Sequence, residues 1–69
     1  MEHVEAPEGY EASVCWIDGA RSWRAFYRQT GETFWTPLDL FGHAETPREE
    51  RTRRAGAMVA GAVRLRGAA

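Results

Sequence analysis

The sequence has no lysine, a single cysteine and no apolar run long enough to cross a membrane. Its nine basic residues are all arginines, and ten acidic residues bring the formal net charge to −1. This balance excludes a global attraction to phosphate or to an anionic membrane, so any nucleic-acid contact has to be local. Because Cys15 has no second cysteine to pair with, an internal disulfide is excluded, and we expect a cytoplasmic protein.

Recognisable catalytic and metal-binding motifs are also missing. Cys15 has no histidine close to it in the sequence, so nothing marks it as a nucleophile. His3, His43 and Cys15 show no ligand spacing typical of a metal site. The chain also lacks a glycine-rich phosphate loop. We therefore predict that the protein is not an enzyme and holds no metal or cofactor.

The length of 69 residues allows one domain. The first nine residues contain Glu2, Glu5 and Glu8 and have little to bury. A segment of this composition gains too little from burial to become ordered. We predict a flexible acidic arm that carries no core over residues 1–9 and a single domain over residues 10–69.

The segment from residue 10 to about residue 41 is rich in β-branched and aromatic side chains. Asp18-Gly19 and Thr30-Gly31 interrupt it with residue pairs that favour turns. This pattern predicts a three-stranded antiparallel meander. Its strands are expected near residues 10–17, 20–29 and 32–38.

A helix is predicted to follow the meander, over residues 47–66. Thr46 and Glu49 have the spacing of a capping box around Pro47 at the first helical position. At the other end, Gly67 favours a helix stop, and arginines occupy the last turn. The predicted fold class is α+β, a three-stranded antiparallel β-meander followed by one C-terminal α-helix packed on one sheet face.

A two-residue turn at Asp18-Gly19 would pair Trp16 with Arg21 and Val14 with Trp23. Strand alternation then gathers most of the large side chains on one face, which we expect to be the core. The predicted core residues of this face are Tyr10, Val14, Trp16, Trp23 and Tyr27. At helical spacing, the stripe expected to pack on them is Ala55, Met58, Val59, Ala62 and Leu65.

One helix covers only one face of a sheet, so the opposite face is expected to stay open. A three-residue second turn places Phe34 on this face, and a two-residue turn places Trp35 there. Aromatic residues flanked by arginine are typical of binding hot spots. We therefore predict a small protein-binding module, a regulator or a phage-type inhibitor. Its predicted partner-binding residues are Arg24, Phe26, Arg28, Phe34 and Trp35.

The outward side of the predicted helix is the second candidate surface. Small residues between arginines are typical of a plain solvated helix face in a sequence rich in Ala and Gly, but they also allow close approach of another backbone, so a homodimer seam is the second interpretation. The predicted seam residues are Arg53, Ala57, Ala60, Gly61 and Arg64.

The alternative function is nucleic-acid binding, with bases stacked on Phe26 and phosphates held by Arg24, Arg28 and helix arginines. Three strands followed by one helix, over about residues 10–66, is similar in layout to the arm-binding domains of tyrosine recombinases. That resemblance involves element order alone, and it implies DNA contact through the sheet. The near-neutral charge makes protein the favoured partner.

Overall fold

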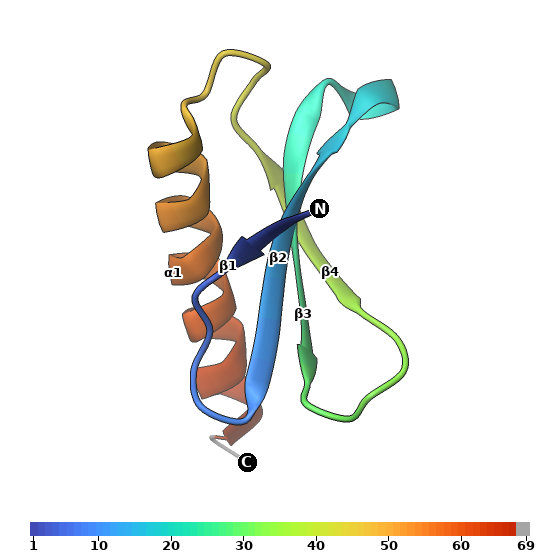
Figure 1. Cartoon of the computed structure of the whole chain (residues 1–69), viewed down its shortest axis with the longest axis vertical. Coiled ribbons are helices and arrows are strands. Elements are labelled where there is room, and N and C mark those ends of the chain that lie inside the picture. The colour runs from blue at the N-terminus through green and yellow to red at the C-terminus, as the bar shows by residue number, and fades with distance from the viewer. Residues whose placement is uncertain (68–69) are drawn as a thin grey trace.

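Within residues 1–67, four strands precede one long helix (Figure 1). The computed structural model describes residues 1–67, and its elements are β1 Glu2–Val4, β2 Tyr10–Ile17, β3 Ser22–Gln29, β4 Thr36–Phe41 and α1 Arg48–Gly67. Each strand pairs antiparallel with the next, which gives the sheet order β1-β2-β3-β4. The helix lies on one face of this sheet (Figure 1). The α+β class and the C-terminal helix are confirmed, but the predicted strand number is wrong because there are four strands.

The additional strand, β1, comes from the segment predicted to be a flexible arm. Val4 pairs with Ala12 of β2 and is only 2% exposed, so the expectation that this segment carries no core is wrong. Strand alternation points Glu2 and Val4 toward α1. A Cβ added at Gly56 would lie 3.6 Å from Val4 Cγ1, so the missing side chain lets β1 approach the helix closely.

The turn between β2 and β3 is longer than predicted. Asp18–Ala20 form one turn of 3-10 helix, and Arg21 follows in the left-handed region with φ 50°. Four residues therefore link the strands instead of two, and Trp16 pairs with Trp23 rather than with Arg21. Because the register shifts by two residues, every side chain keeps its predicted face.

The predicted core face is the one that α1 covers. Trp16 and Trp23 are half-buried at one end of it, with their rings edge to face at 5.3 Å. The buried hydrophobic residues are Val4, Ala12, Val14, Ala25, Tyr27, Phe41, Ala55 and Val59. The face assignment is therefore confirmed, although the fully buried positions include several small residues rather than the tryptophans.

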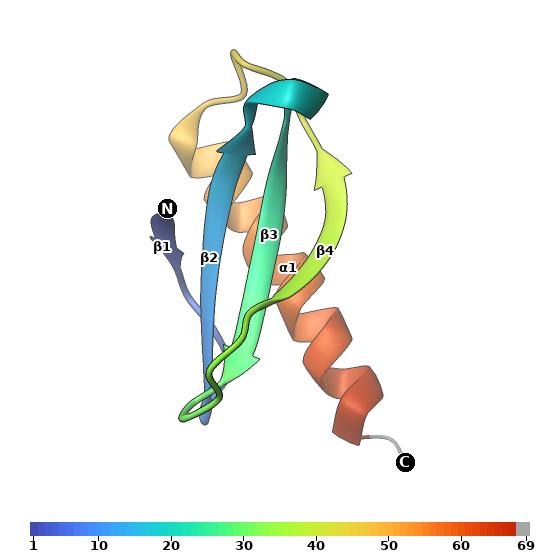
Figure 2. The ribbon, with the colours of Figure 1, turned by 90° about the vertical axis from the view of Figure 1, so that its right-hand side faces the viewer.

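The helix stripe is confirmed in all but its last member. Ala55 and Val59 are buried, and Met58 and Ala62 pack against them. Leu65 is 78% exposed, so its predicted core role is wrong. The helix crosses the sheet diagonally and its C-terminal end extends beyond the strands (Figure 2), which leaves little for Leu65 to contact.

The start of α1 differs from the predicted capping box. The Thr46 hydroxyl accepts a hydrogen bond from the His43 N–H at 2.9 Å, so it closes the preceding loop. Pro47 lies one residue before the helix and its carbonyl accepts from the Arg51 N–H at 2.9 Å. The same loop is fixed to the sheet by Trp23, whose Nε1–H donates to the His43 carbonyl at 2.9 Å.

Candidate binding surface

The sheet face opposite α1 faces the viewer in Figure 2. Cross-strand neighbours share a face, and Arg24 of β3 pairs with Cys15 of β2 on one side and with Leu40 of β4 on the other. One step along, Ser13 pairs with Phe26. We call these five residues the open sheet face. Their apolar and thiol groups surround a single charged side chain, that of Arg24.

Three of the five predicted partner-binding residues, Arg24, Phe26 and Arg28, lie on this side of the sheet. Phe34 and Trp35 do not lie in a strand, because β4 begins at Thr36 instead of near residue 32. Both alternatives for the second turn are therefore wrong. A six-residue connection, residues 30–35, replaces the short turn, and a β-bulge opposite the segment between Arg24 and Phe26 adjusts the β4 register.

The β3–β4 connection crosses one end of this face (Figure 2) and brings Trp35 onto Arg28. The Arg28 guanidinium carbon lies 4.3 Å from the Trp35 ring centroid, within cation–π range. Arg28 Nε also donates to Glu11 Oε1 at 2.9 Å, and Nη1 donates to the Thr33 carbonyl at 3.5 Å. Arg28 and Trp35 are thus engaged within the chain and are poorly placed to act as free binding groups.

Arg24 differs from Arg28 in its hydrogen bonding. Its Nε is buried and has no hydrogen-bond partner among residues 1–67, and the same is true of the Ser13 hydroxyl. Ser13 is 5% exposed. A buried polar group that lacks a partner costs about 1–3 kcal/mol, and more when it is charged. The open sheet face therefore holds an arginine with one N–H group, at Nε, that lacks an acceptor within the described residues.

Large apolar side chains are exposed near the same region. Phe34 is 83% exposed in the β3–β4 connection, and Leu40 is 40% exposed on β4 beside Arg24. Leu40 is not among the binding residues predicted from the sequence. Leu40 lies beyond the end of the predicted strand 32–38, and the bulge that turns it to the open face has no clear sequence signal.

The predicted dimer seam lies on the side of α1 that faces away from the sheet. Arg53, Ala57 and Arg64 are exposed, and Ala60 and Gly61 are half-buried. A Cβ built on Gly61 meets no atom within 4 Å, so space above it is open. Arg53 is not free, because its Nη2 pairs with Glu50 Oε1 at 2.9 Å.

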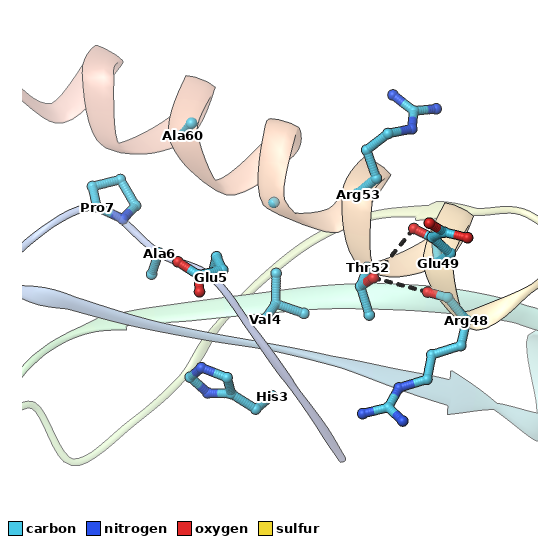
Figure 3. Close-up of a pocket in the computed structure, with 11 residues that line it drawn as sticks. His3, Val4, Glu5, Ala6, Pro7, Arg48, Glu49, Thr52, Arg53 and Ala60 are labelled. Carbon is cyan, nitrogen blue, oxygen red and sulfur yellow. Dashed lines mark hydrogen bonds between the residues drawn. The ribbon is translucent and has the colours of Figure 1, made fainter.

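A groove separates β1 from the first half of α1 (Figure 3). Val4, Gly56 and Ala60 form its apolar part, and charged residues of both signs, such as Glu5 and Arg48, stand at its rim. The Thr52 hydroxyl donates to the carbonyls of Arg48 and Glu49 within the helix. The mixed charge favours no single class of ligand at this groove.

In the part of the chain that the structure describes, no three His, Cys, Asp or Glu side chains are grouped as metal ligands. The same residues include no helix that is both long and apolar enough to cross a membrane. Cys15 is free and half-exposed on the open sheet face.

No protein family, curated protein or solved structure matches this chain. The likeness in layout to recombinase arm-binding domains therefore stays a prediction.

Proposed function

We propose that this chain is a small non-enzymatic protein-binding module whose open sheet face receives the partner. The observation that carries the proposal is the setting of Arg24, which lies with Phe26 and Leu40 on the face that α1 does not cover and whose Nε has no acceptor within residues 1–67. Arginine beside apolar groups is typical of binding hot spots. A carboxylate set among apolar side chains is the chemistry that complements Arg24, Phe26 and Leu40.

Nucleic acid is the less favoured partner. Binding to phosphates needs several unpaired basic groups, and Arg28 is already paired with Glu11. The formal net charge of −1 provides no general attraction for a polyanion. Trp35, an aromatic residue of the predicted binding surface on which a base could stack, is covered on one side by Arg28.

The role we propose is that of a regulator or phage-type inhibitor, which acts by occupying a surface of another protein. Such a role needs a stable face and no chemistry, and one sheet with one helix meets this need. We also propose a cytoplasmic location, because the one cysteine has no partner for an internal disulfide.

The class of partner is tested by affinity capture from a nuclease-treated lysate, using the wild type, Arg24→Gln and Arg53→Gln. Arg53 lies on the helix and serves as the matched control. We expect the wild type and Arg53→Gln to retain the same protein, and Arg24→Gln to lose it. Raising the salt from about 50 to about 200 mM should weaken this capture only modestly, since close and partly buried charge pairs are screened much less than distant exposed charges. Loss of all capture on nuclease treatment, or a drop of about 10³-fold with salt, would indicate nucleic acid and overturn the proposal.

A further inference from the structure

A second groove lies between β4 and the C-terminal half of α1, on the opposite flank of the helix from β1. Its volume is about 410 Å³. The residues that line it are Pro37, Leu38, Asp39, Met58, Gly61, Ala62 and Leu65. Asp39 is the one charged residue among them. The groove is therefore an apolar slot with a carboxylate on its β4 side.

Leu65 stands at the rim of this groove and is 78% exposed. Leu65 and the apolar lining of the groove form one continuous apolar surface, which favours contact with a partner. The two features belong to one surface, so a second copy turned by a two-fold rotation presents its own Leu65 to the groove of the first. Such a contact is isologous, because the same surface of both copies forms it and each copy contributes both the inserted Leu65 and the groove that receives the partner's Leu65.

The charged residues of this surface also complement those of a second copy. Asp39 and Arg64 are both exposed, and neither belongs to an ion pair formed within residues 1–67. Arg64 directly precedes Leu65 in the helix. When Leu65 of a second copy enters the groove, the adjacent Arg64 comes within reach of Asp39. The two-fold axis repeats this pair, so each dimer gains two opposite-charge contacts.

We propose that the chain forms a two-fold homodimer through this β4–α1 groove, with Leu65 of each copy inserted in the groove of the other. The surface shares Gly61 and Arg64 with the outward helix seam predicted from the sequence, but it also includes β4 and excludes Ala60, which lines the groove on the β1 flank. It leaves the open sheet face free, so dimerisation is independent of the proposed partner binding.

The test is sedimentation equilibrium of the purified chain, which gives the dimer dissociation constant. We expect a dimer that Leu65→Glu converts to a monomer and that Ala60→Arg, on the other flank, leaves intact. A wild type that stays monomeric up to about 1 mM, a dimer that survives Leu65→Glu, or one that Ala60→Arg disrupts, would overturn the proposal. The last result would assign the contact to the outward helix face or the β1 flank. Thermal unfolding of each variant confirms that it is folded.

Exchanging the charges of Asp39 and Arg64 tests the proposed pairing independently through the dimer dissociation constant. Asp39→Arg alone and Arg64→Asp alone should each raise the dissociation constant at least about tenfold, because each places like charges together twice in the dimer. The chain that carries both substitutions restores opposite charges, and its dissociation constant should return toward that of the wild type. Failure of the double variant to recover would overturn the proposed pairing.

Discussion

Arg51 and Glu2 lie 49 residues apart in the sequence and form a two-pronged ion pair. Arg51 Nε donates to Glu2 Oε1 at 2.7 Å, and Nη2 donates to Oε2 at 2.6 Å. The same guanidinium lies 4.3 Å from the Trp23 ring centroid and donates to the Thr46 carbonyl at 3.0 Å. One arginine of α1 thus connects β1, β3 and the loop before the helix.

This pair predicts a pH-dependent stability. The hydrogen bond from Arg51 holds the pKa of the Glu2 carboxyl below its usual value of 4.5. A carboxyl whose pKa is lower in the folded chain adds stability above the unfolded pKa and loses it as the pH falls through the folded pKa. We expect Glu2→Gln to lower the thermal midpoint by about a few degrees at pH 7, and the difference from the wild type to shrink below pH 4.5.

Thermal unfolding by circular dichroism at about pH 7 and about pH 3 measures this effect. Glu5→Gln, a change of an exposed residue just beyond β1, is the control and should leave the midpoint unchanged at both pH values. Equal effects of the two substitutions at pH 7 would contradict the role assigned to the Arg51 pair.

Trp23 and Phe34 make a second matched pair, because both are aromatic and only Trp23 is packed. Trp23→Ala removes an edge-to-face contact with Trp16 and the hydrogen bond to the His43 carbonyl. We expect it to lower the free energy of unfolding by about 3 kcal/mol, and Phe34→Ala to change it by less than about 0.5 kcal/mol. Urea unfolding measures both values. A wild-type value for Trp23→Ala would mean that the core face is assigned wrongly.

Gly42 is predicted to tolerate no side chain. It has φ +70°, and a Cβ there would lie 2.9 Å from the Thr46 Oγ1 that binds the His43 N–H. We expect Gly42→Ala to destabilise the fold by about 1–3 kcal/mol. In contrast, Gly19 has open space around it and no positive φ, so Gly19→Ala should be neutral or stabilising by up to about 1 kcal/mol. Equal denaturant midpoints for the two variants would refute this view of the loop before α1.

The sequence was sufficient for the class of fold because its strongest signals are local. The predicted faces of Val14 and Tyr27 are correct although the predicted turn is too short. The register error is two residues, and an even shift keeps each side chain on its face. The stripe at Ala55 and Val59 defined the buried side of the helix in the same way.

The features that the sequence did not predict depend on contacts between distant segments. β1 looked like an acidic arm because Glu2 finds its counter-ion in Arg51, and nothing within residues 1–9 shows this. Trp35 lies in the β3–β4 connection instead of its expected strand, and there it packs on Arg28. Two predicted binding residues, Arg28 and Trp35, therefore contact each other. The candidate site is then limited to Arg24 and its neighbours on the open sheet face.

Protein capture by the open sheet face is tested most directly by comparing the wild type with a chain carrying both Arg24→Glu and Phe26→Ala. Protein retained from a nuclease-treated lysate is quantified alongside thermal unfolding of the two chains. We expect the double variant to keep its midpoint within about a few degrees, because both side chains lie on the face that α1 does not cover. Its retained protein should fall at least about tenfold, as loss of a hot-spot arginine and an aromatic anchor predicts. Undiminished capture by a folded double variant would contradict the assignment of the open sheet face as the binding surface.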